Sequence, residues 1–490
     1  MILDDILKIL KKRSKNKAYT INKKSFSYSE LYNFSCNLYN FILEENKEKK
    51  PIIVYGHKEI YIKATFLACS FAGITYVPVD ESLPEQRINN IIEQVEPYCI
   101  IGDFESNKCK NISKNEIYNI MNRKSITDIN KIYLRPDDIY YIIFTSGSTG
   151  MPKGVKVTYR NLNSCINWLN SIIQVKKGII LNQANFSFDL SVADLYLSLI
   201  SESEHFIIEN RKKLDFLNVF EDLKRSNATV AVMTPSFADL LLLDKSFGKE
   251  ILPNLRTIIF CGERLLKATA LKLRSRFDDI KIINSYGPTE CTFAVTSIEV
   301  TDEILKQDNI PVGKPKEDTE IIIVDKNKNK LNDGQVGEIL IAGESVAEGY
   351  IGNNKQHTFI KYNKKNAYLT GDLGYLKNGI LYFEHRIDNQ IKYKGYRIEL
   401  SDIENNLYKL DYLEKVKVVE KTTNDGIVTN IVAFVKIKQG VKKTEVDIKK
   451  DFKAKVPDYM SPNIKILNEF PINNNGKIDI QGLRRLINER

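Results

Sequence analysis

The stretch YYIIFTSGSTGMPKGVKVTYRN occupies residues 140–161. A run of strand-forming residues enters a loop, TSGSTGMPKG (145–154), with three glycines, four Ser or Thr hydroxyls and one lysine. Small residues let backbone N–H groups approach phosphate oxygens, and hydroxyls add further donors. The loop lacks the GxxxxGK[ST] spacing of the Walker motif. It therefore predicts a phosphate loop of another kind, with a mobile surface loop as the alternative.

Around this loop, short apolar runs alternate with amphipathic helical patterns. The predicted buried strands are PIIVYG (51–56), TYVPVD (75–80), TIIFCG (257–262) and KIINSYG (281–287). The predicted helices between such strands include residues 85–96 and 268–277. This alternation is typical of an α/β architecture with largely parallel sheets. Functional residues are then expected at the carboxyl ends of the strands.

The pattern changes twice in the second half of the chain. From about residue 318, TEIIIVD, VGEILIAG and GILYFEH predict a meander of antiparallel strands. From near residue 388, YLEKVKVVE and IVAFVKIK flank a turn and predict a hairpin, followed by helices over 445–455 and 479–489. We therefore predict a large domain over residues 1–387 and a small α+β domain over residues 388–490, which moves on a hinge.

The composition is that of an ordinary globular protein, with 490 residues, 43% hydrophobic and 27% charged. No run approaches the roughly 20 apolar residues of a membrane span. The N-terminal MILDDILKILKKRSK predicts an amphipathic helix rather than a signal peptide. The seven cysteines form no CxxC pair, which argues against disulfides and a zinc site and fits a reducing compartment. We expect a cytoplasmic monomer that does not insert into membranes.

The net charge of +10 is concentrated near the C-terminus. From Asn389 onward the chain has 20 Lys or Arg and 14 Asp or Glu, an excess of six positive charges. These charges are spread over predicted helices and turns, and no aromatic RNA-reading motif accompanies them. The pattern argues against nucleic acid and favours an acidic protein partner for the C-terminal region.

Seven segments, in order, resemble motifs of the adenylate-forming superfamily, which includes amino-acid adenylation domains, acyl-CoA synthetases and luciferase. The segments are AGITYVPVD (72–80), TSGSTGMPKG (145–154), FSFDLSVADLY (186–196), NSYGPTE (284–290), YLTGDLGYLKNG (368–379), HRIDNQIKYKGYRIELSDIE (385–404) and NNNGKID (473–479). No single segment would decide the matter, but seven in the family's order make chance negligible. The resemblance covers nearly the whole chain.

The resemblance implies an enzyme that joins a carboxylate to ATP, releases pyrophosphate and passes the acyl group to a thiol. The residues expected at the β- and γ-phosphates are Thr145, Ser146, Gly147, Ser148, Thr149, Gly150 and Lys153. Those expected around the adenosine and the α-phosphate are Asn284, Tyr286, Gly287, Thr289, Asp372, Arg386 and Lys477. Thr145, Lys153, Glu290 and Lys477 are expected to be catalytic, with Glu290 holding Mg²⁺ through oxygen.

The resemblance also assigns individual roles. It implies that Tyr286 stacks near the adenine, Asp372 accepts the ribose hydroxyls, Lys477 reaches the α-phosphate and Asp388 is the hinge. Because attack at the α-phosphorus concentrates negative charge, positioning and cations carry such a reaction. Taken singly, Asp372 could be a turn residue, Lys477 a solvated lysine and Asp388 a surface aspartate in a salt bridge.

FSFDLSVADLY places the carboxylate of Asp189 among aromatic and aliphatic residues, where a buried anion needs a cation. In amino-acid-activating members of the superfamily, this position pairs with the substrate ammonium. The alternative is that Asp189 caps the following helix. Further stretches resemble the D-alanine–D-alanyl carrier protein ligases, among them TPSFADLLLLDKSF (234–247) and FCGE around Cys261. The resemblance implies that Cys261 lines a small alanine pocket; an ordinary buried thiol is the alternative.

Gly287, Phe293 and Val295 are the other expected substrate-binding residues. Phe293 stands where the ligases are expected to have a smaller aliphatic residue, so the pocket could be reshaped. The leading hypothesis is adenylation of D-alanine and its transfer to the phosphopantetheine thiol of a separate carrier protein, with ATP and Mg²⁺. The main alternative is a standalone peptide-synthetase-type enzyme for glycine, L-alanine or β-alanine. An acyl-CoA synthetase and a non-catalytic nucleotide-binding protein are less favoured.

Overall fold

The computed structural model describes the chain in two compact units. Residues 125, 148–149, 210–215, 353–357, 389, 424, 454, 473–477 and 489–490 lie outside the described part. The first unit comprises Met1–Glu81, Ile92–Phe144 and Gly154–His385, and the second comprises Ser82–Ile91, Thr145–Lys153 and Arg386–Arg490. The division of the chain at residues 387 and 388 stays a prediction.

The nine-stranded sheet of the first unit has the order β15-β14-β13-β12-β11-β9-β10-β1-β2. The strands from β1 to β13 along this order pair in parallel, whereas β2, β14 and β15 pair antiparallel at the two edges. Their bounds are β1 (Lys17–Ile21), β2 (Lys24–Ser27), β9 (Ile179–Asn182), β10 (Glu204–Ile207), β11 (Val230–Met233), β12 (Thr257–Phe260), β13 (Lys281–Tyr286), β14 (Thr296–Glu299) and β15 (Lys314–Pro315).

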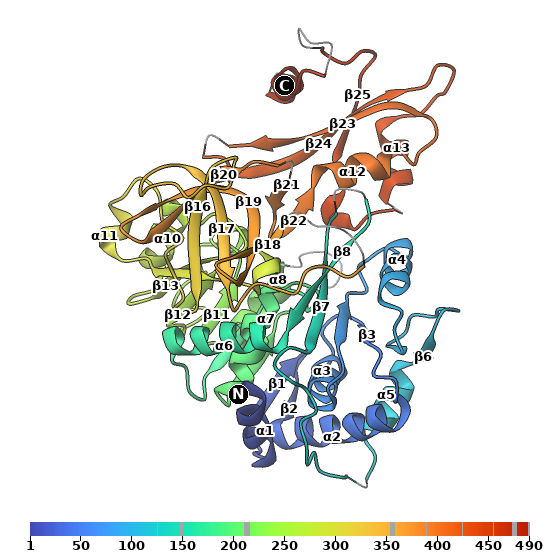
Figure 1. The fold of residues 1–490 in the computed structure, drawn as a ribbon, viewed down its shortest axis with the longest axis vertical. Coiled ribbons are helices and arrows are strands. Elements are labelled where there is room, and N and C mark those ends of the chain that lie inside the picture. Colours follow the sequence, from blue (N-terminus) through green and yellow to red (C-terminus); the bar gives the residue numbers. More distant parts are fainter. Residues whose placement is uncertain are drawn as a thin grey trace. The chain divides into compact units, whose positions relative to one another are not determined.

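A six-stranded sheet has the order β6-β5-β3-β4-β7-β8, and a five-stranded meander contains β16 to β20. The bounds in the six-stranded sheet are β3 (Ile52–Tyr55), β4 (Tyr76–Val79), β5 (Cys99–Ile101), β6 (Lys110–Ile112), β7 (Ile139–Thr145) and β8 (Lys153–Thr158). Those in the meander are β16 (Thr319–Val324), β17 (Gly337–Gly343), β18 (Phe359–Tyr362), β19 (Lys365–Lys377) and β20 (Ile380–Arg386). Figure 1 shows β16, β17 and β19 side by side.

The helices outside the C-terminal region connect and cover these strands (Figure 1). They are α1 (Ile2–Lys11), α2 (Tyr28–Glu45), α3 (Ile60–Ala72), α4 (Glu85–Val95), α5 (Lys114–Met121), α6 (Tyr159–Ile173), α7 (Leu190–Ile200), α8 (Phe216–Ser226), α9 (Pro235–Leu241), α10 (Lys267–Arg276) and α11 (Asp302–Leu305). Local signals set several ends. Ser27 and Glu30 form a capping box at α2, and Gly73 ends α3 with φ of 69°.

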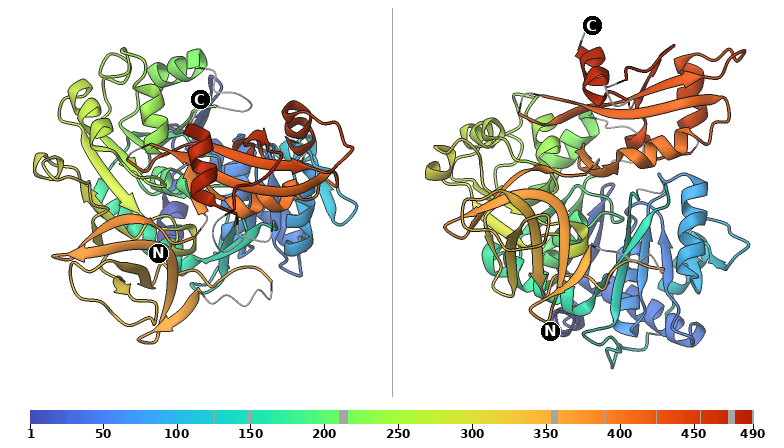
Figure 2. Two further views of the ribbon diagram at one scale, coloured as in Figure 1. Left: turned by 90° about the horizontal axis from the view of Figure 1, so that it is seen from above. Right: turned by 45° about the horizontal axis from the view of Figure 1, so that its top comes forward.

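The C-terminal region of the second unit is a small α+β structure. The strand bounds are β21 (Gln390–Tyr393), β22 (Tyr396–Glu399), β23 (Leu413–Thr422), β24 (Val428–Ile437) and β25 (Asn463–Ile466), and the helices are α12 (Leu400–Leu407), α13 (Glu445–Lys453) and α14 (Ile480–Asn488). Strands β23 and β24 form the predicted antiparallel hairpin. Figure 2 shows α14 beside these strands, where Leu483 and Ile487 join Val419 and Phe434 in one apolar cluster.

The structure confirms the predicted α/β class, the strands quoted above, the meander and the N-terminal amphipathic helix. All seven cysteines are free thiols, as the spacing predicted. Among the described residues, no helix combines the length and the apolar character that a membrane span requires.

The core of the first unit is not entirely apolar. Lys58, Lys63, Asp194 and His205 are each 0% exposed. They come from three segments of the chain, because Lys58 and Lys63 lie just before and on α3, Asp194 lies on α7 and His205 lies on β10. Buried charges persist in proteins only when they are paired and hydrogen-bonded. This charge cluster therefore constrains how the segments pack.

The charge cluster predicts a pH-dependent stability. Burial lowers the pKa of Lys63 from its usual 10.5 to about 7. Between these values the unfolded chain binds a proton that the folded chain lacks, so the contribution of Lys63 to stability rises with pH, at most about 1.4 kcal/mol per pH unit. We expect Lys63→Met to flatten the rise in urea midpoint between pH 7 and pH 9. An unchanged slope in the variant would contradict this assignment.

Candidate active site

Three of the predicted site residues follow parallel strands of the nine-stranded sheet. Cys261 comes directly after β12 and Gly287 directly after β13, and Asp189 ends the segment that links β9 to α7. The carboxyl ends of parallel strands meet at one edge of a sheet, and α/β enzymes bind ligands there. The first unit therefore brings these three residues to the same edge.

Asp189 is half-buried at the start of α7. Its backbone is already helical (φ −63°, ψ −21°), and its side chain makes no cap hydrogen bond. The alternative that Asp189 caps the helix is therefore wrong. Burial raises the pKa of the hydroxyl of Tyr141, and the negative charge of Asp189 adds to this effect. Asp189 therefore lies close enough to act electrostatically on the buried hydroxyl of Tyr141.

Cys261, Gly287 and Phe293 form one wall at this edge. The thiol of Cys261 lies 3.7 Å from the carbonyl oxygen of Phe293, to which it donates a weak hydrogen bond. A Cβ on Gly287 would lie 2.9 Å from the same oxygen and 2.7 Å from the Cα of Ala294. Phe293 itself has a left-handed backbone with φ of 70°, which is uncommon for an aromatic residue. A tight turn after β13 thus holds Phe293 against the two predicted pocket residues.

Val295 and Asn284 have structural partners in the same region. Val295 is 0% exposed, and its N–H donates to the carbonyl of Tyr286 at 2.8 Å. The side-chain amide of Asn284 is buried and donates to the carbonyl of Pro311 at 2.8 Å. The partners of both residues are backbone carbonyls, and these hydrogen bonds hold the chain around β13 in place. Ligand contacts for Val295 and Asn284 stay predictions.

Tyr286 and Asp372 lie together in the first unit. The hydroxyl of Tyr286 donates to Oδ2 of Asp372 at 2.6 Å, and both side chains are buried. The N–H of Asp372 in turn donates to the hydroxyl of Thr370 at 3.0 Å. This bond fixes the backbone of Asp372 within β19, and with it the position of the carboxylate. Sequence reasoning predicted both residues for adenosine but not their contact. A carboxylate whose orientation is fixed in this way suits the recognition of a vicinal diol.

Glu290 is 1% exposed and lies in the short 3₁₀ turn Thr289–Cys291. The hydroxyl of Tyr350 donates to Oε1 of Glu290, and the N–H of Ala347 donates to the Glu290 carbonyl at 2.9 Å. Thr289 is 9% exposed in the same turn. The turn thus places Thr289 and Glu290 just after β13, and their phosphate and metal roles stay predictions.

The loop between β7 and β8 belongs to the second unit. A Cβ on Gly147 would lie 2.0 Å from the carbonyl oxygen of Met151, so only glycine fits this turn. Burial raises the pKa of Asp402, whereas Arg87 and a backbone hydrogen bond from Gly147 lower it. The backbone of this loop therefore already donates to an anion.

Two further side chains of the loop contact the β22 segment. The hydroxyl of Ser146 donates to the carbonyl of Arg397 at 2.9 Å and accepts from the N–H of Glu399 at 3.2 Å. The ammonium of Lys153 lies 3.7 Å from the Glu399 carboxylate. Burial raises the pKa of Glu399, and Lys153 lowers it. Lys153 is thus paired with a carboxylate, and Thr145 donates only a long 3.5 Å bond to the Lys153 carbonyl.

Arg386 and Asp388 form a two-pronged ion pair at the start of the C-terminal region. Nε and Nη2 of Arg386 lie 2.8 Å from the two carboxylate oxygens of Asp388. The alternative of a surface aspartate in a salt bridge describes what the structure contains, since the Asp388 side chain is 44% exposed. A hinge role for Asp388 stays a prediction. Lys477, Ser148 and Thr149 lie outside the described residues.

The chain is similar to known proteins over most of its length. The family described as AMP-binding enzyme matches residues 8–351. The chain belongs to the AMP-binding enzyme family. The D-alanine–D-alanyl carrier protein ligase of Bacillus licheniformis is 38% identical over 500 residues, covering 99% of both chains. The ligase of the same name from Listeria monocytogenes is 39% identical and covers 94% of both chains.

Solved structures of AMP-binding enzymes share the fold. The adenylation domain AlmE of Vibrio cholerae, solved with glycyl-adenosine-5′-phosphate, has a TM-score of 0.84 at 21% identity, covering 100% of this chain and 98% of that one. The o-succinylbenzoate CoA synthetase MenE of Bacillus subtilis has a TM-score of 0.82 at 19% identity, covering 98% of both chains. At these identities the likeness supports the fold alone.

Sequence reasoning about this AMP-binding enzyme missed three partners of its site residues. Tyr350 donates to Glu290, Thr370 fixes Asp372, and Glu399 pairs with Lys153. Thr370 could have been found, because it lies two residues before Asp372 in the motif YLTGDLG. Tyr350 and Glu399 lie 60 and 246 positions from their partners, and no local pattern signals such contacts.

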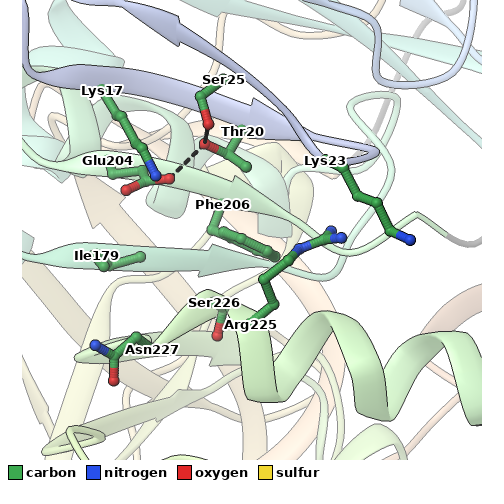
Figure 3. A pocket seen from close by; sticks show the side chains of 10 residues that line it. All are labelled: Lys17, Thr20, Lys23, Ser25, Ile179, Glu204, Phe206, Arg225, Ser226 and Asn227. Carbon is green, nitrogen blue, oxygen red and sulfur yellow. Dashed lines mark hydrogen bonds between the residues drawn. The ribbon is translucent and has the colours of Figure 1, made fainter.

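A separate cavity of about 340 Å³ lies in the first unit (Figure 3). Its lining includes Lys17, Glu204 and Ile179, the first residues of β1, β10 and β9. The Glu204 carboxylate accepts a hydrogen bond from Thr20. These residues mark the amino ends of the parallel strands, at the edge opposite Asp189. The cavity is therefore distinct from the candidate active site.

Proposed function

We propose that this AMP-binding enzyme adenylates D-alanine with ATP and transfers it to the phosphopantetheine thiol of a separate carrier protein, releasing pyrophosphate and AMP. The observation that carries the choice of an amino acid is Asp189, a half-buried carboxylate at the strand ends that does not cap its helix. The relatives that are 37–39% identical and bear the name D-alanine–D-alanyl carrier protein ligase support D-alanine.

In this proposal the first unit binds the nucleoside and the amino acid. Asp372, oriented by Tyr286 and Thr370, accepts the ribose hydroxyls. Asp189 holds the substrate ammonium in an ion pair of opposite charges. The substrate carboxylate is already ionised at neutral pH, so its attack on the α-phosphorus requires no general base. The bond from the α-phosphorus to the bridging oxygen then breaks, and pyrophosphate leaves.

The loop Thr145–Lys153 is proposed to hold the β- and γ-phosphates. Gly147 already donates its N–H to a carboxylate, and Lys153 is paired with one, so both groups suit an anionic ligand. Glu290 fits a magnesium ion, because Tyr350 orients its carboxylate and oxygen is the ligand that Mg²⁺ prefers. When bound, Mg²⁺ would neutralise charge on the phosphates. Lys477 is proposed to donate to the α-phosphate.

The acyl acceptor is proposed to be a thiol on an acidic carrier protein. Residues 389–490 carry an excess of six positive charges. Opposite charges on two partners raise the rate at which they meet. We expect Asp388 to act as the hinge between the adenylating and transferring states, because it starts the C-terminal region in an ion pair with Arg386.

Pyrophosphate exchange across a panel of amino acids tests the substrate. The panel contains D-alanine, L-alanine, glycine and β-alanine, with acetate as an acid that lacks an ammonium. We expect D-alanine to have a kcat/KM at least about tenfold above the others, and acetate to give background exchange. Faster exchange with another amino acid would contradict D-alanine and leave adenylation intact. Glycine is the strongest rival, because Phe293 is bulkier than the aliphatic residue expected at its position and glycine is the smallest amino acid in the panel.

A further inference from the structure

The segment that carries Asp189 is short and is held at both ends. It runs from Gln183, directly after β9, to Asp189, directly before α7. Within it, the N–H of Phe188 donates to the carbonyl of Asn185 at 2.9 Å, which forms a tight turn. The ring of Phe186 is 4% exposed and packs against the ring of His205, with centroids 6.1 Å apart. The segment therefore rests directly on the charge cluster of the core.

Lys58 is hydrogen-bonded to the first residue of this segment. Its ammonium donates to the carbonyls of Gln183 at 2.9 Å and Ile208 at 3.1 Å. Gln183 and Ile208 are the residues directly after β9 and β10. At this point, where the pairing between the two strands ends, the N–H of Ile208 donates to the carbonyl of Asn182 at 3.1 Å. Lys58 itself follows β3 of the other sheet. One buried ammonium thus ties the carboxyl ends of strands from two sheets.

Asp194 anchors the same region from the helix side. Both of its oxygens accept from the side-chain amide of Asn182, at 3.0 and 3.1 Å, and that amide also donates to the Ala184 carbonyl at 3.1 Å. Nε2 of His205 lies 2.9 Å from Asp194. The side-chain amide of Asn182 therefore links the carboxylate of Asp194 to the backbone of the segment 183–189.

Lys63 completes the cluster through hydrogen bonds to residues outside the segment. Its ammonium lies 3.4 Å from Nδ1 of His205, 3.2 Å from the hydroxyl of Ser198 and 3.5 Å from the Ala18 carbonyl. While Lys63 is protonated it can only donate, so Nδ1 then accepts and Nε2 donates to Asp194. Burial lowers the pKa of His205, which fits this neutral form. Lys58 and Lys63 are thus equally buried, and only Lys58 holds the backbone before Asp189.

We propose that Lys58 is a positioning residue for amino-acid recognition, which fixes the segment 183–189 so that Asp189 meets the substrate ammonium. This inference rests on the proposed role of Asp189. A displacement of about 1 Å in a binding carboxylate is enough to cost a large share of its interaction with a cation. Lys58 does not touch the substrate, and its effect passes through the Gln183 carbonyl.

Lys58→Met and Lys63→Met are a matched pair for the test, since each removes one fully buried ammonium from the same cluster. The measurement is amino-acid-dependent pyrophosphate exchange, with whichever panel member wild type uses best. We expect Lys58→Met to raise KM for the amino acid at least tenfold, with KM for ATP within about threefold of wild type. Lys63→Met should leave both KM values within about threefold. Hydrogen exchange at amides 184–189 should accelerate only in Lys58→Met.

Two results would overturn the inference. One is an equal rise in amino-acid KM for both variants, which would indicate general damage to the core. The other is an unchanged KM in Lys58→Met with only a lower melting temperature, as a purely structural role predicts. If Lys58→Met does not fold, Lys58→Leu also removes the N–H donors, and a wild-type KM there would likewise overturn the inference.

Asp189→Ala separates this inference from the proposed function. If that variant keeps the wild-type amino-acid KM, the role proposed for Asp189 is wrong and the inference falls with it. If Asp189→Ala raises the KM and Lys58→Met does not, only the inference about Lys58 is wrong.

Discussion

Lys477→Ala should abolish measurable adenylation while leaving the transfer step largely intact. The loss expected is about 100- to 1,000-fold in amino-acid-dependent pyrophosphate exchange, the usual effect of removing one donor aimed at developing negative charge. The reason is that negative charge concentrates at the α-phosphate during attack, and Lys477 is proposed to meet it. Thiol transfer from a preformed acyl-adenylate forms no bond to phosphorus, so it should stay within about threefold of wild type.

Lys442→Ala is the control for this result. Lys442 is an exposed lysine of the same unit and has no proposed role in the site. We expect it to leave both half-reactions unchanged. Equal loss of adenylation and transfer in Lys477→Ala would contradict the proposal that two conformations present different residues to the two steps.

Asp189→Ala should remove most of the affinity for the amino acid. A charge pair that loses one buried partner typically costs about 2–5 kcal/mol, which is at least about 30-fold in KM. The physical reason is that the substrate ammonium would enter a half-buried site without its counter-charge. KM for ATP should change little, because the proposed ribose contact is made by Asp372, which is fixed independently by Tyr286 and Thr370.

Asp189→Asn separates charge from shape at the same position. The amide keeps the size of the carboxylate but cannot neutralise an ammonium, so its KM should approach that of Asp189→Ala. A wild-type KM in either variant would exclude Asp189 as the ammonium partner. The measurement is the amino-acid KM in pyrophosphate exchange at saturating ATP, beside the ATP KM at saturating amino acid.

The strands and helices around the site were predictable because their signals are local. The alternation of buried runs such as TIIFCG and KIINSYG with amphipathic patterns follows from the burial of both sheet faces. The placement of Cys261 and Gly287 at one sheet edge follows from the same α/β pattern, since both lie at the ends of predicted strands. Strand β9, which precedes Asp189, was not among the predicted strands. The resemblance to the adenylate-forming superfamily then assigned chemistry to these positions.

Contacts between distant segments were not predictable from local patterns. Tyr286 and Asp372 were both expected near the adenosine, yet the direct 2.6 Å hydrogen bond between them requires β13 and β19 to be packed. The same holds for Tyr350 on Glu290 and for Glu399 on Lys153. Each pair joins segments that belong to different motifs, and no periodicity within either motif encodes the other.

The amino-acid sequence alone was enough to establish the α/β class and to predict a phosphate loop and candidate site residues, because turn geometry and strand periodicity act over a few residues. The tertiary structure decided which groups those residues meet. It ruled out helix capping by Asp189, and it placed the ammonium of Lys58 on the backbone that leads to Asp189. A buried charge takes its partners from wherever the fold brings them, because an unpaired charge in the core is too costly to keep.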